Sequence, residues 1–291
     1  MLEAIAEHQN TKNLDALRSG LRRLGYAEGR NLRIEYRSAD GRSERFRDLA
    51  QDLVRLKVDV ILSRGTPATL AATSATSSIP VVMATMGGPQ AVVVGFGPGS
   101  NVTGVTTFST ELTAKRLELL KELAPRLSRV AMIHNMANPA APPEWQAMQD
   151  AARSLRLQAE LIDVSVESDV LRAADRAADG KIDGVVVGAD GLMQGHQRLL
   201  VDALNGRGLA ASYPGSEFVE GGGLMAYAVN FSDLYARLAV FVDKIIKGGK
   251  PSTIPVEGPT KFELAINLRT AKLLGLTVPG SLLLRADRLI R

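Results

Sequence analysis

The sequence predicts an α/β protein made of two lobes, each built around a parallel β-sheet. Three observations support this prediction. The chain has 291 residues, which exceeds one average domain. It is 45% hydrophobic and 23% charged, as in globular proteins, and only 4% aromatic, so its core must consist mainly of Val, Leu, Ile and Ala. Finally, short β-branched runs alternate with segments of helical periodicity about 10–15 residues long, and this series occurs twice.

The first half of the chain contains helices marked by leucine spacing and strands marked by alternation or β-branching. Leucines recur at helical spacing from Leu14 to Leu24, and Gly25 is suited to end that helix. Residues 31–36 alternate between apolar and charged side chains, as on a half-buried strand. We expect helices at 13–24, 43–56 and 110–123, a helix that begins near residue 66, and strands at 31–36, 58–62, 79–84 and 102–107. Residues 2–5 form only a short apolar stretch and are assigned to no element.

A second series of strands and helices begins at residue 130. Strands are expected at 130–134, 159–164, 184–188, 209–212, 223–228 and 262–267. Helices are expected at 143–155, 168–178, 195–207, 232–247 and 268–274, the last being the final helix before Gly275. The chain is expected to change lobes near 108–113. Two consecutive series of this kind indicate two domains with parallel sheets.

The composition excludes several classes of function. The absence of cysteine rules out disulfides, thiol catalysis and cysteine metal sites. The net charge is +4, but Lys and Arg are interleaved with Asp and Glu, so we expect no nucleic-acid partner. No apolar run approaches the roughly 20 residues that would span a membrane. Residues 1–20 lack the features of a signal peptide, which leaves the location of the protein open.

No catalytic or cofactor motif is complete. Gly95, Gly97 and Gly99 resemble a dinucleotide-binding loop, but Ser100 stands where the last glycine of that motif should lie. A strand follows instead of a helix, so the motif is incomplete. Residues 248–252 contain Lys-x-Ser without the glycine spacing of a P-loop. His8, His134 and His196 lie far apart, and none has a partner at metal-binding spacing. We therefore expect no catalytic residue, no metal and no cofactor, and an α/β enzyme is the weaker alternative.

The turn around Arg64 is suited to bind an anion. A β-branched run ends at Ser63, Arg64 and Gly65, and an alanine-rich helix follows, with Thr66 placed to cap it and Pro67 at its first position. Ligands of open α/β sheets bind at the carboxyl ends of the strands, and the first turn of a helix favours an anion. Arg64 adds a positive charge and a planar set of donors. An ordinary turn with a solvated arginine is the alternative.

Other expected strand ends also carry small, polar or aromatic residues. These loops are 63–66, 85–88, 135–138, 189–192, 213–216 and 227–230. If the strands are parallel, the loops meet at one crevice between the lobes. A crevice lined by hydrogen-bonding groups and a few rings is suited to bind a small molecule, and closure of the two lobes around it is the expected mechanism.

Motifs throughout the chain resemble those of one known family. They include Leu24-Gly25-Tyr26, Gly65-Thr66-Pro67-Ala68, Asn101-Val102-Thr103-Gly104, Gly221-Gly222-Gly223-Leu224-Met225-Ala226-Tyr227, Lys247-Gly248-Gly249-Lys250-Pro251 and Ala271-Lys272-Leu273-Leu274-Gly275. In combination they resemble the substrate-binding proteins of ABC importers, in the family that includes tryptophan- and tyrosine-type binding proteins. The resemblance covers nearly the whole chain.

The resemblance implies a type I periplasmic binding protein fold, with two Rossmann-like lobes, a multi-segment hinge and a ligand between the lobes. The N-terminal lobe would comprise 1–108 and about 230–256, and the C-terminal lobe 109–229 and about 257–291. It also implies a periplasmic or other extracytoplasmic location, a signal peptide that is not present in this sequence, and an ABC permease as membrane partner. We expect a monomer. A ligand-sensing domain of a receptor or regulator with the same fold is the alternative.

Family members tend to bind small, often aromatic, amino acids and related acids. Many carry an acidic residue where this chain has Gly88 before Pro89, and such an acid is suited to pair with a ligand's ammonium group. Without it, and with Arg64 present, we expect an aromatic or other hydrophobic carboxylate that lacks an amine, in preference to an amino acid.

The predicted ligand site combines three groups of residues. The charged end of the ligand would lie at residues 63–66, its apolar body among Met86, Tyr213 and Tyr227, and amide donors would come from three asparagines. The full set of predicted ligand-binding residues is His8, Ser63, Arg64, Gly65, Thr66, Met86, Gly87, Asn135, Asn138, Ala189, Asp190, Tyr213, Tyr227 and Asn230.

Overall fold

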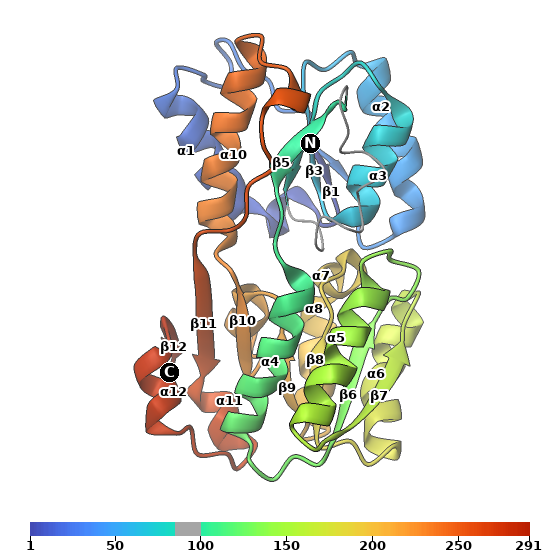
Figure 1. Cartoon of the computed structure of the whole chain (residues 1–291), viewed down its shortest axis with the longest axis vertical. Coiled ribbons are helices and arrows are strands. Elements are labelled where there is room, and N and C mark those ends of the chain that lie inside the picture. Colours follow the sequence, from blue (N-terminus) through green and yellow to red (C-terminus); the bar gives the residue numbers. More distant parts are fainter. Residues whose placement is uncertain (85–99) are drawn as a thin grey trace. The chain divides into compact units, whose positions relative to one another are not determined.

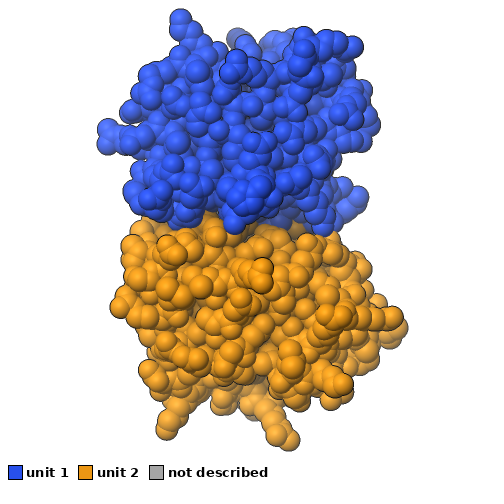
Figure 2. Space-filling model, turned by 180° about the vertical axis from the view of Figure 1, so that it is seen from behind, with its two compact units in different colours: residues 1–108, 230–261 blue, residues 109–229, 262–291 orange. Residues whose placement is uncertain are grey.

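The computed structural model describes residues 1–84 and 100–291 (Figure 1). Met86, Gly87 and the rest of the expected loop 85–88 lie outside the described residues. The chain forms two compact units, coloured separately in Figure 2. Unit 1 comprises Met1–Phe108 and Asn230–Lys261, and unit 2 comprises Ser109–Val229 and Phe262–Arg291. Within the described ranges, no helix combines the length and apolarity needed to cross a membrane.

Unit 1 contains a five-stranded sheet in the order β2-β1-β3-β4-β5, with all neighbouring strands parallel. The strands are β1 (Leu2–Glu3), β2 (Arg37–Ser38), β3 (Ile61–Arg64), β4 (Val81–Ala84) and β5 (Val102–Val105). The helices are α1 (Thr11–Arg23), α2 (Phe46–Arg55), α3 (Thr66–Ala75) and α10 (Phe231–Ile246), with short 3₁₀ turns η1 (Glu7–Gln9), η2 (Ser43–Arg45) and η4 (Pro251–Thr253). Helices α1 and α10 cover one face of the sheet, and α2 and α3 cover the other (Figure 1).

Close packing of α1 against α10 depends on a glycine. A Cβ atom at Gly20 would lie 2.8 Å from both the carbonyl oxygen of Ala236 and the Cβ of Ala239. The other face of the sheet buries Leu53, Ile61 and further apolar residues of α2, α3 and the strands. Of the leucines predicted to share one face of the first helix, Leu14, Leu17 and Leu21 are buried, whereas Leu24 is exposed.

Three predictions for unit 1 were wrong in detail. Residues 2–5 are more than an apolar stretch, because β1 pairs with both β2 and β3 inside the sheet. The strand predicted at 31–36 begins later, at Arg37; the alternating segment before it is half-buried without joining the ladder. The residue that caps α3 is Gly65, with φ +87°, and not Thr66, so Pro67 occupies the second helical position. Only glycine adopts such a φ at little cost, which explains why it precedes the helix.

Unit 2 contains a seven-stranded sheet in the order β12-β11-β10-β9-β8-β6-β7. The strands are β6 (Arg129–His134), β7 (Gln158–Asp163), β8 (Gly184–Val187), β9 (Ala210–Tyr213), β10 (Met225–Val229), β11 (Phe262–Asn267) and β12 (Arg288–Ile290). The helices are α4 (Ser109–Leu123), α5 (Ala141–Ser154), α6 (Glu167–Asp179), α7 (Gly191–Gly195), α8 (Gln197–Gly206), α9 (Ser216–Glu220), α11 (Leu268–Leu273) and α12 (Gly280–Arg285). Residues from α4 and α5 pack on one face of the sheet, and residues from α6, α8 and α9 pack on the other.

The second unit also corrects several predictions. Strand β11 is antiparallel to β10, because residues 230–261 between them belong to unit 1 and make no crossover within this sheet. The helix predicted at 195–207 is α8, whereas the short helices α7 and α9 were not predicted. The helix at 268–273 is not the last element, since α12 and β12 follow it. The remaining pairs are parallel, so the predicted α/β class with parallel-dominated sheets is confirmed.

Candidate ligand-binding site

The predicted anion-binding turn of unit 1 lies where β3 passes into α3. Ser63 is buried, and its hydroxyl shares a 2.8 Å hydrogen bond with that of Thr69. Thr66 is also buried, and its Oγ1 has no hydrogen-bond partner among the described residues. The turn therefore presents the first N–H groups of α3 together with a buried hydroxyl, and its sequence fixes this geometry through Gly65.

Arg64 is buried, with 4% of its surface exposed. Its guanidinium carbon lies 4.5 Å from the centre of the Phe231 ring and 5.9 Å from that of Tyr235, both at the start of α10. One Nη donates to the side-chain oxygen of Asn10 at 3.4 Å. Cation–π contacts hold the guanidinium in one place, so Arg64 is a pre-positioned charge and not a solvated arginine.

Glu3 places a carboxyl group close to this arginine. It ends β1, the strand next to β3, and its Oε1 accepts a 2.7 Å hydrogen bond from the hydroxyl of Tyr235. Burial raises the pKa of Glu3 above its usual range, although Arg64 and Tyr235 act in the opposite direction. Sequence reasoning missed Glu3 because it lies in a segment that was assigned to no strand.

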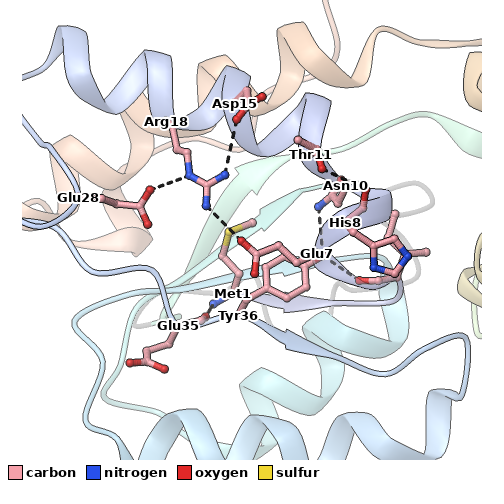
Figure 3. A network of polar contacts seen from close by, with 11 residues as sticks. Met1, Glu7, His8, Asn10, Thr11, Asp15, Arg18, Glu28, Glu35 and Tyr36 are labelled. Carbon is pink, nitrogen blue, oxygen red and sulfur yellow. Dashed lines mark hydrogen bonds and ion pairs between the residues drawn. The ribbon is translucent and has the colours of Figure 1, made fainter.

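His8 lies in an exposed 3₁₀ turn that ends just before Asn10 (Figure 3). Its carbonyl oxygen accepts a 3.0 Å hydrogen bond from Thr11. Asn10, which contacts Arg64, also donates to the hydroxyl of Tyr36 at 3.4 Å. On the surface around this turn, Arg18 forms ion pairs with Glu7, Asp15 and Glu28, with N–O distances of 3.2, 3.6 and 2.7 Å.

Asn230 is the last predicted residue that belongs to unit 1. Its side-chain oxygen accepts a 2.9 Å hydrogen bond from the backbone of Asp233 and thereby caps α10. Capping is a sufficient structural reason for an asparagine at this position. Any role in ligand binding stays a prediction.

Four predicted residues of unit 2 lie together after β6 and β8. Asn138 donates to Oδ2 of Asp190 at 2.8 Å, and Oδ1 of Asp190 caps α7 by accepting from Leu192 at 2.8 Å. Asn135 shapes its own loop, because its side-chain oxygen accepts from the backbone of Ala137 at 3.0 Å. The two loops are thus joined by side-chain contacts at the carboxyl edge of the sheet, where ligands of α/β proteins bind.

A buried ionic group lies directly behind these loops. His134 and Glu144 are both fully buried, and Nε2 of the histidine lies 3.3 Å from a carboxylate oxygen of the glutamate. Thr113 donates to the same oxygen at 3.3 Å. Arg116 lies nearby, donating through Nε to the carbonyl of Tyr227 at 2.9 Å, and burial lowers its pKa to about 10. Burial of the Glu144 carboxyl would raise its pKa, but His134, Ser109 and Arg116 outweigh burial and lower it.

The two predicted tyrosines differ in exposure. Tyr213 is fully buried and stacks on Phe218, with ring centres 5.2 Å apart, inside the core of unit 2. Burial raises the pKa of its phenol well above the usual value. Tyr227 is half-buried and stacks on Phe262 at 6.0 Å. Of the two rings, Tyr227 has the surface to contact a ligand.

Unit 1 also contains a cavity of about 570 Å³ at the amino ends of its strands. Its walls include Leu17, Leu21, Val58, Val60 and Ile246. None of the predicted ligand-binding residues lines it. It lies at the edge of the sheet opposite to the one where ligands of α/β proteins bind. Within the described ranges, no group of three or more His, Asp or Glu side chains could hold a metal ion.

A family model for ABC transporter substrate binding proteins matches residues 2–290. The chain belongs to this family. A curated relative, the tyrosine-binding protein of Clostridioides difficile strain R20291, is 27% identical over 282 residues, which cover 94% of this chain and 79% of the relative. The resemblance inferred from the sequence motifs is therefore confirmed.

Solved structures confirm the fold of this substrate-binding protein. A conserved domain protein from Vibrio cholerae superposes with a TM-score of 0.91 at 24% identity, covering 99% of this chain and 97% of that one. The ABC domain from Streptococcus pneumonia in complex with L-Trp superposes with a TM-score of 0.87 at 22% identity, covering 99% of both chains. The type I periplasmic binding protein fold is thus shown.

Proposed function

We propose that this protein is the solute-binding component of an ABC importer and captures a small aromatic amino acid or a related carboxylate. The observation that carries the proposal is the family match across residues 2–290. The curated relative is named for tyrosine, and one structural neighbour holds L-Trp. Two lobes close around the ligand, and the closed protein delivers it to a membrane permease.

The carboxylate of the ligand would bind at the turn after β3. Arg64 supplies a fixed positive charge, and the first turn of α3 supplies N–H groups. Amide groups of Asn135 and Asn138 would contribute further hydrogen bonds, and Tyr227 a ring surface. All these groups lie at or near the ends of strands.

Calorimetric titration with matched ligands tests the ligand class. L-tyrosine and L-tryptophan are compared with 3-(4-hydroxyphenyl)propionate and indole-3-propionate, which lack only the amine. The relative named for tyrosine and the structural neighbour in complex with L-Trp favour the first pair, whereas Gly88 and Arg64 favour the second. Binding of neither pair would contradict the proposal, and a preference for one pair decides whether the ligand carries an amine.

A substitution tests the role of Arg64. Arg64→Ala should weaken a carboxylate ligand by about 2–5 kcal/mol if the pair is desolvated. Arg153→Ala is the matched control, because that arginine lies on the exposed surface of α5 with its side chain 73% exposed. Unchanged affinity of Arg64→Ala would remove this residue from the site.

The proposed function also includes a location, an oligomeric state and the absence of catalysis. The protein would act outside the cytoplasm, as a monomer and without catalysis, so a bound ligand should be recovered chemically unchanged. Recovery of an altered ligand by mass spectrometry would favour the α/β enzyme alternative. Binding of the ligand-loaded protein to a receptor, and not to a permease, would favour the alternative of a ligand-sensing domain.

A further inference from the structure

His134 and Glu144 form a buried pair that contacts both predicted ligand loops of unit 2. The ring of His134 ends β6, and Glu144 projects from the first turn of α5. Both side chains have no exposed surface. A buried histidine–carboxylate pair costs free energy to desolvate. We therefore expect the pair to have a role that offsets this cost.

The hydrogen bonds determine where the proton of His134 lies. Its Nδ1 accepts a 2.8 Å hydrogen bond from the backbone N–H of Asn135. A neutral imidazole has one N–H, so the proton is on Nε2, the nitrogen that faces Glu144 at 3.3 Å. The histidine therefore accepts from the ligand loop on one side and faces the carboxylate on the other.

Glu144 reaches the second loop. Its Oε2 accepts a 3.4 Å hydrogen bond from the backbone N–H of Ala189, which directly precedes Asp190. Asp190 in turn holds Asn138 of the first loop at 2.8 Å. The pair thus fixes the backbone at two points from which predicted ligand-binding side chains project.

Space around the ring is also restricted. A Cβ atom at Gly188 would overlap the His134 ring, with Nε2 only 2.7 Å away. The residue between β8 and Ala189 must therefore be glycine for the ring to occupy this position. The packing leaves the imidazole little freedom to rotate away from its two partners.

Charged groups face the ring from each element packed against it. These are Glu144 of α5, Arg116 of α4 and Asp190 after β8; Asp163 of the neighbouring strand β7 is in register with His134 but is exposed and accepts a hydrogen bond from the backbone of Met136. Burial disfavours a charge on the ring, but Glu144 and Asp190 outweigh burial and Arg116, and the pKa of His134 is raised. Uptake of a second proton by His134 is therefore favoured relative to an ordinary imidazole.

We propose that His134 and Glu144 are positioning residues for the ligand loops of unit 2, and that proton uptake by His134 displaces Asn135 and weakens ligand binding. A proton on Nδ1 would face the N–H of Asn135, donor against donor, so the backbone must move. The movement reaches Asn138, whose N–H donates to the carbonyl of Asn135 at 3.0 Å. This inference rests on the proposed function, since it assumes that these loops bind the ligand.

The first experiment measures affinity for L-tyrosine and L-tryptophan between pH 5.0 and 8.5. Loss of one positioning hydrogen bond predicts a fall in affinity of about three- to tenfold as the pH decreases, with a midpoint above about 6.5. His134→Gln should remove the pH dependence. The matched control is His196→Gln, because that histidine also belongs to unit 2 and lies 3.5 Å from Glu167. A flat profile in the unchanged protein, or a profile preserved in His134→Gln, would overturn the inference.

The second experiment needs neither a ligand nor a variant. Nitrogen-15 NMR of the unchanged protein should show His134 as the Nε2–H tautomer at pH 8.5, and the amide signal of Asn135 should titrate with the same midpoint as the ring. An Nδ1–H tautomer, or an Asn135 amide that does not move, would refute the inference even if the ligand binds. If the protein binds neither the amino acids nor their amine-free analogues, the proposed function fails, and the NMR titration still decides whether proton uptake moves the loop.

Discussion

Glu3 in unit 1 and Glu144 in unit 2 are both buried glutamates beside a buried arginine, yet their pKa values shift in opposite directions. For Glu3, burial is the dominant effect and raises the pKa. For Glu144, burial also raises the pKa, but His134, Ser109 and Arg116 together outweigh it. The difference shows that the set of partners, and not burial alone, decides whether a buried acid carries its charge.

The groups that hold the buried charges also differ between the two units. Arg64 lies against the rings of Phe231 and Tyr235, so aromatic faces hold the cation of unit 1. In unit 2, hydrogen bonds to backbone groups hold the charges: Arg116 donates to a strand carbonyl, and Glu144 accepts from a loop amide. Unit 2 is therefore expected to be more sensitive to the loss of a charge.

The largest effect is expected for Glu144→Gln. Removing this charge leaves Arg116 buried without its anion, and we expect a loss of about 3–5 kcal/mol of unfolding free energy at pH 7.5, measured by urea denaturation. Because the pKa of Glu144 is lowered, its contribution is present above the unfolded value of about 4.3 and is lost as the pH falls below it. Glu118→Gln, on the exposed face of α4, is the control and should cost less than about 0.5 kcal/mol.

Tyr235→Phe tests the corresponding contact in unit 1. The variant removes the 2.7 Å hydrogen bond to Glu3 while keeping the ring that faces Arg64. We expect a loss of about 1.5–3 kcal/mol in the same denaturation measurement. Tyr26→Phe, which removes a half-buried hydroxyl bonded to Asp243, should cost less. A cost for Tyr235→Phe above that of Glu144→Gln would reverse the proposed ranking of the two units.

Gly188→Ala probes the packing of His134 in unit 2. The added methyl group overlaps the imidazole and should cost about 1–3 kcal/mol through overpacking, measured by thermal unfolding. Gly206→Ala is the control, because nothing lies within 4 Å of a Cβ there and alanine favours the helix. Equal stability of the two variants would show that the ring is free to move.

The smallest effect is the pH dependence of Glu3→Gln. Since the pKa of Glu3 is raised, the fold favours its neutral form, and the unchanged protein loses stability as the pH rises above about 4.3. The stability advantage of the unchanged protein over Glu3→Gln, measured by urea denaturation, should therefore fall between pH 4.5 and 7.5. The slope is opposite to that for Glu144→Gln, and two slopes of the same sign would refute the comparison.

Part of the buried pair in unit 2 was detectable in the sequence. Glu144 shares a helical face with Met148 and Ala152, both buried, so an acid on this apolar face signals a buried charge. His134 ends an apolar strand, and the alternatives of a crevice or a packed position could not be separated from sequence alone. The partner was not predictable, because the contact joins a strand end to a helix whose packing direction periodicity does not give.

The sequence by itself determined the α/β class, most of the apolar face of α1, and the family. These depend on local spacing and on motifs that are contiguous in the chain. Only the tertiary structure decided that β1 is an inner strand, that β11 runs antiparallel to β10, and that Arg64 lies beside Glu3. Such features join residues that are distant in sequence, as when Arg116 donates to the carbonyl of Tyr227. Local sequence patterns do not indicate which distant group will pair with a buried charge.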